Sequence, residues 1–461
     1  MRIGLVSYEY PPQQGLGGVG TYMFRLAGAL GTAGHEVHVM AGPSDRTPVP
    51  QANVHLHRIP AQYEIDSSSR AVKWLYWRGF ARLMAWVHPA IWHWLKWDLA
   101  TLEALRELHA AHPLDIIEAP EHAGNAWMAG HIHAWPIVMR MHCPWELFVR
   151  INRFPFNPMN RLMAALERRT VAAYADALTV PSEAMKREVE RSWTLRRTPV
   201  VIPNFMDIPE APAPLPADES MPRIVCVGRI EPLKGQDTLA CAFAAIAARH
   251  PGARLIIVGP DRWPGQRSFP AILARLVPDP AIRARIELPG MVPLEKIACL
   301  LREARLMVCC SRGFESFSYA ALEALAAARP IIVTNTGALP ELILHEQTGL
   351  VVRSSDAQAL AGAMDRLLSN RAESERFALA GHARARLCYH TPHVLPQILE
   401  AYQDAADFYC SVKAAGSERT AREWRRALAA GADGEPCAVS NPGPPRESAG
   451  PGFLKPSSNV A

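Results

Sequence analysis

Two cations close together in the chain indicate where a phosphate could bind. Arg229 and Lys234 flank a short turn in the segment VGRIEPLKGQDTL, which begins with the end of an apolar run typical of a strand. Cations placed on either side of such a turn can converge on one diphosphate. Two solvated surface cations are the alternative interpretation of the same residues.

Two acids in the segment SRGFESFSYAALEALAAARP could bind other parts of an extended ligand. Glu315 is expected in a loop, and Glu323 well inside a helix that runs to Ala328. A carboxylate among alanines and leucines is costly unless it binds a hydroxyl or a cation. Ser316 or Ser318 could cap this helix, whose N-terminus would then point free N–H groups at the ligand. A surface helix with one exposed glutamate is the alternative.

A glycine-rich loop lies near the start of the chain. Gly15, Gly17 and Gly20 match G-x-G-x-x-G in the letters GLGGVG. A dinucleotide site is disfavoured, because seven residues separate the first strand from this loop and no acid ends the second strand. Backbone amides at a helix N-terminus would still face an anion or a sugar, and a flexible strand–helix turn is the alternative.

The sequence suggests neither a metal centre nor a glycosidase. It contains no Asp-x-Asp, the spacing that would bridge a divalent cation to a diphosphate. His131, His133 and His142 have no nearby cysteine or acid that would complete a zinc site. A carboxylate pair of glycosidase type is also not apparent. We therefore expect no metal and no cofactor.

Alternating strand and helix patterns must position these residues. RIGLVSY, LDIIEA and PIVMRMH read as buried strands, and VGTYMFRLAGAL has apolar residues at helical spacing. The alternation restarts after residues 203–222, which contain six prolines and read as a linker. Ser182 is expected to cap the helix 183–192. The pattern predicts an α/β fold with doubly wound parallel sheets in two units.

The composition excludes several other classes of protein. The chain has 461 residues, 49% of them apolar, and no apolar run approaches the ~20 residues of a membrane span. We expect no signal peptide, and nine cysteines without a CxxC indicate a reducing cytosol rather than a disulfide framework. The net charge of +5 is too small over this length to indicate nucleic-acid binding.

Residues 70–98 combine aromatic and basic side chains. They hold six of the twelve tryptophans, and five basic groups against Asp98. A second basic stretch, residues 140–169, has six arginines against two glutamates. Tryptophan together with Arg and Lys favours an anionic membrane interface. A buried amphipathic helix pair with its aromatics in the core is the alternative.

Six segments occur in the order seen in one enzyme family. They are the glycine-rich loop, VIPNFMD, VGRIEPLKG, LIIVGPD, FESFSYAALEAL, and TGALPELI with HEQTGLVV. In these segments the sequence resembles the retaining glycosyltransferases of family 4 (glycosyl transferases group 1), over nearly the whole chain except its tail. The resemblance implies a GT-B fold, with two Rossmann-like domains facing a central cleft, and metal-independent sugar transfer that keeps the anomeric configuration.

The resemblance also implies which residues hold the donor diphosphate. Arg229 and Lys234 would be the basic pair, joined by the amides around Ser316, Phe317 and Ser318. The leaving diphosphate gains charge in the transition state. Fixed cations and a helix N-terminus can stabilise that charge in place of a divalent ion.

Other residues would act on the sugars. Glu315 would contact donor-sugar hydroxyls and support the positive charge that develops at the anomeric carbon, and Glu323 would hold the nucleotide ribose. Gly17 and Gly18 would approach the donor from the opposite domain. His142, at the end of a strand, would orient a sugar hydroxyl or the acceptor.

The sequence departs from the family pattern at three places. The usual E-G-F-G loop reads ESFS at 315–318, so it cannot use dihedrals that only glycine adopts. Arg329 stands where a glycine usually precedes the final proline, and Gly337 with Ala338 replaces a pair of glycines.

These observations give the expected organisation and function. The domains are an acceptor-side Rossmann-like domain 1–203, a linker 204–222, a nucleotide-sugar domain 223–392, a helix 393–415 that could return to the first domain, and a disordered tail 416–461. The expected enzyme transfers sugar from a UDP-, GDP- or ADP-sugar to a glycan or lipid-linked acceptor in polysaccharide or glycolipid synthesis, without nucleic acid. It would be cytoplasmic or peripheral at the inner face of the membrane, through residues 70–98. A non-catalytic sugar-nucleotide-binding protein and a GT-B epimerase are the alternatives.

Overall fold

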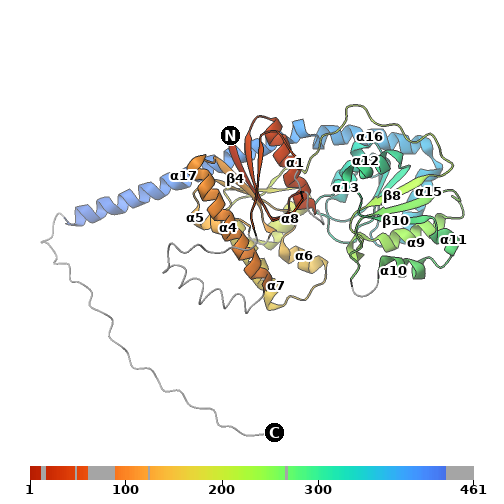
Figure 1. Cartoon of the computed structure of the whole chain (residues 1–461), viewed down its shortest axis with the longest axis horizontal. Helices are drawn as coiled ribbons and strands as arrows, with labels where there is room; N and C mark the ends of the chain where they lie inside the picture. Colours follow the sequence, from red (N-terminus) through yellow and green to blue (C-terminus); the bar gives the residue numbers. More distant parts are fainter. Residues whose placement is uncertain (12–16, 47–48, 61–88, 123–124, 265–267, 432–461) are drawn as a thin grey trace, which may run out of the picture. The chain divides into compact units, whose positions relative to one another are not determined.

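The fold consists of two parallel β-sheets with their helices (Figure 1). The computed structural model describes residues 1–11, 17–46, 49–60, 89–122, 125–264 and 268–431. Within these residues every strand pairing between named strands is parallel. The expected α/β class with two Rossmann-like sheets is therefore confirmed.

The first sheet has seven strands in the order β3-β2-β1-β4-β5-β6-β7. Its register places Ile3 of β1 opposite Val37 of β2 and Ile116 of β4. The strands are β1 (Arg2–Ser7), β2 (Glu36–Ala41), β3 (Val54–Arg58), β4 (Ile116–Pro120), β5 (Ile137–Arg140), β6 (Ala177–Val180) and β7 (Val200–Val201). The helices are α1 (Gly18–Thr32), α4 (Pro89–Ala111), α5 (Trp127–Ile132), α6 (Trp145–Ile151), α7 (Pro158–Tyr174) and α8 (Glu183–Ser192).

Helices cover both faces of this sheet, because alternate strand residues point to opposite sides. Leu5 and Val39 pack in one buried cluster with Leu26 of α1. Val6 and Met40, one residue further along each strand, pack in another cluster with residues of α4. Fully burying one such aliphatic side chain stabilises the fold by about 1.5–3 kcal/mol. This double cover fixes the carboxyl edge of the sheet, where the first half of the site lies.

The second sheet has six strands in the order β10-β9-β8-β11-β12-β13. The strands are β8 (Arg223–Val227), β9 (Arg254–Val258), β10 (Ile286–Gly290), β11 (Leu306–Cys309), β12 (Ile331–Thr334) and β13 (Leu350–Val352). The helices are the 3-10 helix η3 (Pro232–Lys234), α9 (Gln236–Ile246), α10 (Phe269–Leu276), α11 (Pro280–Arg283), α12 (Leu294–Glu303), α13 (Tyr319–Ala326), α14 (Leu339–Leu342), α15 (Ala357–Ser369) and α16 (Arg371–Tyr389). Two buried clusters again line its opposite faces, one with Ile224 and the other with Val225 of β8.

The last helix, α17 (Thr391–Gly431), packs its first turns on the first sheet. Val394, Ile398 and Tyr402 belong to the same buried cluster as Leu5 of β1. Tyr402 also donates a hydrogen bond of 2.6 Å to the buried carboxylate of Glu118. The first turns of α17 therefore pack against the N-terminal half of the chain.

The first part of the C-terminal tail is helical, whereas the sequence predicted disorder from residue 416 onward. Residues 416–431 were expected to be disordered, but α17 continues to Gly431. The segment SERTAREWRRALAA is rich in alanine, arginine and glutamate, which have high intrinsic helix propensity. Residues 432–461 lie outside the described residues.

Arg329, which stands where the family usually has a glycine, has a structural role in this chain. Its side chain is fully buried, and its guanidinium donates to the carbonyl groups of Ala213 at 2.5 Å and Pro214 at 2.6 Å in the linker. The same group also reaches the carbonyls of Ala327, Arg302 and Ala304. Burial, with Arg305 nearby, lowers the pKa of Arg329 to about 10. Arg329 thus joins the proline-rich linker to the second sheet and its helices.

The tryptophan-rich stretch is described only in part, because residues 61–88 lie outside the described residues. Trp97 of α4 is fully buried, and Trp94 packs against Met159 and Met163 of α7. Both therefore contribute to the core rather than to a free face. Among the described residues, no helix combines the length and the apolar character that crossing a bilayer requires.

Candidate functional site

The loop after β8 carries Arg229 and Lys234. Gly235 closes its turn at a φ of +71°, and a Cβ there would lie 2.1 Å from the carbonyl oxygen of Cys310, so only glycine fits. Gln236 then donates from Nε2 to the carbonyl of Arg229 at 2.8 Å, which holds the two ends of the loop together. The local sequence therefore fixes both cations on one short turn.

Lys234 is paired with Glu315. The Nζ of Lys234 lies 2.6 Å from Oε1 of Glu315, and Ser311 donates its hydroxyl to the same oxygen. Burial lowers the pKa of Lys234, but the Glu315 carboxylate raises it by more, so its net pKa is above the usual value. The ammonium therefore stays charged at neutral pH, as a diphosphate ligand requires.

The residues that follow β12 contact the loop that carries Glu315. Ala338 donates its N–H to the carbonyl of Glu315 at 2.7 Å, and Gly337 has a φ of +53°. A Cβ on Gly337 would lie 2.1 Å from the carbonyl oxygen of Glu315, so this glycine is required, whereas its neighbour tolerates a methyl group. None of residues 315–318 has a positive φ, which explains how ESFS replaces a glycine-containing loop.

The N-terminus of α13 follows this loop. Ser318 is its N-cap and accepts a hydrogen bond from the N–H of Ala321 at 3.3 Å, so one of the two expected caps is confirmed. The helix was expected to run to Ala328 but ends at Ala326, because Ala328 adopts a φ of +51° and the N–H of Arg329 turns back to the carbonyl of Ala324.

Glu323, in the second turn of α13, meets a cation that the sequence did not reveal. Arg25 of α1 donates from Nη2 to Oε1 of Glu323 at 2.8 Å and lies 4.5 Å above the ring of Tyr319. Burial raises the pKa of Glu323, and Arg25 partly offsets this. Glu323 is therefore a mostly enclosed carboxylate with one cation, and not the exposed glutamate of the alternative interpretation. Arg25 was missed because it lies 298 residues away in the chain.

The glycine-rich loop begins α1 and packs against Glu9. A Cβ on Gly17 would lie 2.8 Å from Oε2 of Glu9, whereas one on Gly18 would meet nothing within 4 Å. Burial raises the pKa of Glu9, while Arg229 and the amides of Gly20 and Gly17 lower it in part. Gly18 thus leaves open space at the helix N-terminus, whereas a side chain at Gly17 would require the carboxylate of Glu9 to shift. Gly15 lies outside the described residues.

His142 follows β5 and is almost fully buried. Its N–H donates to both oxygens of Glu121 at 2.9 Å, and its ring meets the ring of Tyr22 edge-on. Burial, with Arg140 and His122, holds its pKa well below the usual value, so the imidazole is neutral at pH 7. Its Nε2 is buried without a hydrogen-bond partner among the described residues. A neutral ring with one unused nitrogen can orient a hydroxyl.

Contacts join the candidate site residues of the first sheet's half of the chain to those of the second sheet's half. Burial raises the pKa of Cys143, the residue after His142, while Glu315 raises it a little more and Lys234 lowers it. Ser182, the N-cap of α8 as expected, donates its hydroxyl to the carbonyl of Ser316 at 2.8 Å. The ends of strands from both sheets therefore meet around Glu315, with Phe317 buried behind the loop.

The other histidines considered as zinc ligands do not gather. His133 pairs with Asp176 at 2.9 Å, and His131 lies against Tyr174. His142 is enclosed by Tyr22 and Glu121 instead.

Two all-parallel sheets whose strand ends meet around a lysine–glutamate pair define a GT-B type of fold. The chain matches the family "Glycosyltransferase Family 4" over residues 16–209 and "Glycosyl transferases group 1" over residues 221–370. The chain therefore belongs to the family 4 glycosyltransferases, as the six segments in its sequence indicated.

Individual relatives agree with this assignment. A GDP-mannose-dependent alpha-(1-6)-phosphatidylinositol monomannoside mannosyltransferase of Mycobacterium tuberculosis is 33% identical over 35% of this chain, and the match spans 42% of that protein, less than half its length. A glycogen synthase of the same organism is 27% identical over 83% of this chain and 90% of its own. Sucrose-phosphate synthase of Thermosynechococcus elongatus shares the fold with a TM-score of 0.68 and 23% identity, over 87% of this chain and 98% of its own.

Proposed function

We propose that this chain transfers a sugar from a nucleotide-diphosphate sugar to a glycan or lipid-linked acceptor, with retention of the anomeric configuration and without a divalent ion. The observation that carries the proposal is the pair formed by Lys234 and Glu315, 2.6 Å apart at the end of the second sheet. A cation for the diphosphate and a carboxylate for the sugar are then side by side, as the bond between sugar and phosphate requires.

The diphosphate would replace carboxylates that now occupy the cations. Arg229 pairs with Glu231 at 3.1 Å, and Lys234 pairs with Glu315. Both cations can turn to a phosphate, and the N-terminus of α13 adds a partial positive charge to the same place. Once the donor is bound, these groups are held in place before the bond between sugar and phosphate breaks, so they stabilise the leaving diphosphate with little further reorganisation.

The two acids would serve different parts of the donor. Glu315 is only 13% exposed, so its charge acts in a poorly solvated site where it favours a positive anomeric carbon. Glu323 would hold the ribose hydroxyls, and the donor would then share this carboxylate with Arg25 or displace it. The open side of Gly18 would admit the donor from the first sheet.

His142 would position the acceptor or a sugar hydroxyl rather than act as an acid. Its lowered pKa leaves it neutral at pH 7, so Nε2 can accept a hydrogen bond from a hydroxyl. The departing phosphate would deprotonate the acceptor on the same face, which gives retention.

A donor panel tests this proposal. The purified protein is mixed with UDP-, GDP- and ADP-sugars, and nucleoside diphosphate release is measured in EDTA, with and without glycan and lipid-linked acceptors. We expect release from one base class, and an acceptor should accelerate it. Stabilisation by a donor with no release would instead identify a sugar-nucleotide-binding protein, and a changed sugar on intact donor would identify an epimerase.

A further inference from the structure

A glutamate and three histidines lie close together on two neighbouring strands of the first sheet, away from His142. Glu36 and His38 are on β2, and His55 and His57 are on β3. Glu36 and His55 lie near the starts of these strands, whereas His142 follows the end of β5. The register places His38 opposite His55, and alternate residues of parallel strands share a face, so the three imidazoles lie together.

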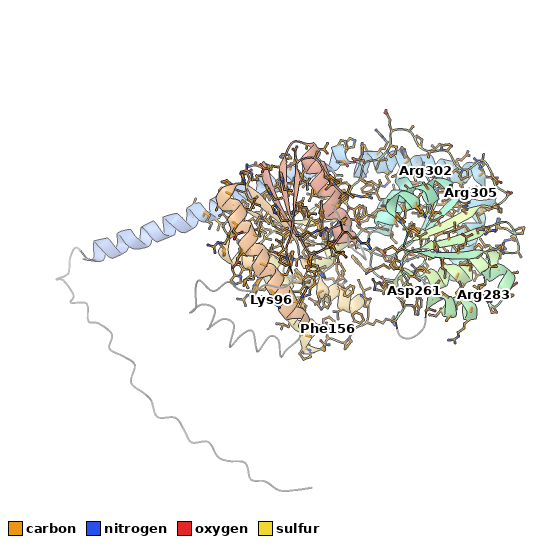
Figure 2. All side chains as sticks on the ribbon, viewed as in Figure 1. Lys96, Phe156, Asp261, Arg283, Arg302 and Arg305 are labelled. Carbon is orange, nitrogen blue, oxygen red and sulfur yellow. The ribbon has the colours of Figure 1, made fainter. Side chains whose placement is uncertain are left out.

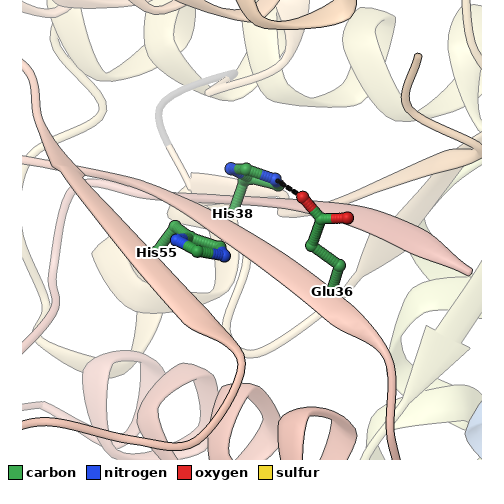
Figure 3. Close-up of side chains that lie close together, drawn as sticks. All are labelled: Glu36, His38 and His55. Carbon is green, nitrogen blue, oxygen red and sulfur yellow. Dashed lines mark hydrogen bonds and ion pairs between the residues drawn. The ribbon is translucent and has the colours of Figure 1, made fainter. Parts of the chain in front are cut away.

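The side chains of Glu36, His38 and His55 converge (Figure 3). One ligand atom from each lies within 4.8 Å of those of the others. The rings of His38 and His55 are stacked at 4.8 Å, and Nε2 of His38 lies 3.1 Å from Oε1 of Glu36. His38 is 5% exposed, whereas His55 is exposed, so an ion could enter from solvent and reach a buried ligand.

Hydrogen bonds to neighbouring residues orient two of these side chains. Nδ1 of His38 lies 3.1 Å from Nε2 of His57, and Nε of Arg2 donates to the second oxygen of Glu36 at 2.9 Å. Metal-binding histidines usually make a hydrogen bond through the nitrogen that does not face the metal, which fixes the ring. His57 gives His38 this arrangement, and Arg2 leaves Oε1 of Glu36 facing the imidazoles.

We propose that Glu36, His38 and His55 bind a zinc ion that water completes to a tetrahedron. Two imidazoles and one carboxylate are a ligand set that zinc takes with an open fourth position. Zinc bonds near 2 Å place ligand atoms about 3.3 Å apart. Oε1 of Glu36 and Nε2 of His38 already lie 3.1 Å apart, so the exposed His55 must rotate inward. Zinc at Nε2 of neutral His38 leaves the proton on Nδ1, which then donates to Nε2 of His57.

The ion would link two strands of the first sheet. β3 is the edge strand of the sheet, and one ion bound by His55 and His38 would fasten it to β2. The site contains no residue assigned to the donor or acceptor, so zinc binding and sugar transfer succeed or fail independently.

Zinc titration of metal-free, untagged full-length protein tests this inference. We expect one equivalent of Zn²⁺ in calorimetry, a rise in melting temperature with Zn²⁺, and visible absorption of tetrahedral type with Co²⁺. His55→Gln changes an exposed side chain, so the protein should fold. The binding of one equivalent of Zn²⁺ and the visible absorption of the Co²⁺ form should both disappear in this variant. Glu36→Gln should weaken binding in the same assay.

Two further variants separate a built site from binding to surface histidines. His57→Phe should keep the stoichiometry but weaken zinc binding about 10–100-fold, because it removes only the partner of Nδ1. The double variant His112→Gln, His393→Gln removes two exposed histidines elsewhere and should change nothing. Loss of zinc binding in this control, its persistence in folded His55→Gln, or its absence from the unmodified protein would each overturn the proposal.

Discussion

Single residues decide how this site handles charge. Lys234 stays protonated because Glu315 offsets its burial, and His142 stays neutral because burial and Arg140 oppose its protonation. Glu121, which the sequence did not single out, accepts the N–H groups of both His142 and Cys143 and so fixes the turn after β5. Each protonation state follows from what surrounds the group.

Replacing Lys234 or Glu315 by alanine should lower sugar transfer by about 100-fold or more, because each removes a fixed charge from the transition state. Steady-state kinetics with the donor found in the panel measure this, and circular dichroism checks the fold. Lys296→Ala, an exposed lysine of the same half, is the matched control and should retain full activity. Unchanged kcat in either site variant would remove that residue's proposed role.

Glu121 should make stability depend on pH. Burial raises its pKa to about 7, although the amides of His142 and Cys143 lower it in part. A carboxyl whose pKa is raised on folding stabilises the protein fully below its unfolded pKa near 4.5, and this contribution is lost as the pH rises through 7. The loss amounts to about 3 kcal/mol.

Urea unfolding at pH 5 and pH 8 measures this effect. The unfolding free energy of Glu121→Gln should fall less between the two pH values than that of the unmodified protein. Glu190→Gln, on an exposed glutamate, should not alter the difference. Equal pH dependence of Glu121→Gln and the unmodified protein would contradict the assigned environment.

At the scale of elements, the apolar runs predicted strands β1, β4 and β5. Capping residues predicted the start of α8 at Ser182 and, as one of two alternatives, the start of α13 at Ser318. β3 was not predicted, because VHLHR alternates a partly buried residue with histidines and reads as polar. The approach of Arg25 to Glu323 and of Arg329 to the linker could not be predicted either, since no local pattern encodes a contact between residues more than a hundred positions apart. The sequence motifs therefore indicated which loops carry the site residues. The long-range contacts of these residues depend on tertiary packing and could be seen only in the structure.

Arg329→Ala should destabilise the protein by about 3 kcal/mol, because it leaves several buried carbonyl groups without a donor and opens a cavity. The free energy of unfolding in urea is the measurement. Arg275→Ala, an exposed arginine of α10, should change it by less than about 0.5 kcal/mol. A similar small effect of Arg329→Ala would show that the linker does not depend on this side chain.

At the scale of the whole molecule, peripheral membrane contact was expected through residues 70–98, but Trp94 and Trp97 of this stretch pack inside the protein. We propose that exposed aromatics after α6 make this contact instead. Phe154 and Phe156 are 48% and 41% exposed beside the exposed Arg153 and Arg161, and Figure 2 labels Phe156 and Lys96 on the first half of the chain. Trp94, within residues 70–98, packs against α7, which follows these phenylalanines. Exposed aromatics among arginines suit an anionic headgroup layer.

Flotation with anionic vesicles tests this contact. The unmodified protein should float at low salt and less at high salt, because screening weakens attraction to the headgroups. Phe154→Ser with Phe156→Ser should reduce binding about tenfold or more. Leu379→Ser with Leu387→Ser, exposed leucines of α16, should not. No flotation of the unmodified protein at low salt would end the proposal.

The central claim is that fixed cations hold the donor diphosphate without a divalent ion. Calorimetric titration with the nucleoside diphosphate of the donor, in EDTA and then in Mg²⁺, tests it most directly, using the unmodified protein, Arg229→Ala and Lys234→Ala. We expect tight binding in EDTA that Mg²⁺ does not improve, and at least tenfold weaker binding in each variant. Binding that requires Mg²⁺, or that is equal in all three proteins, would contradict it.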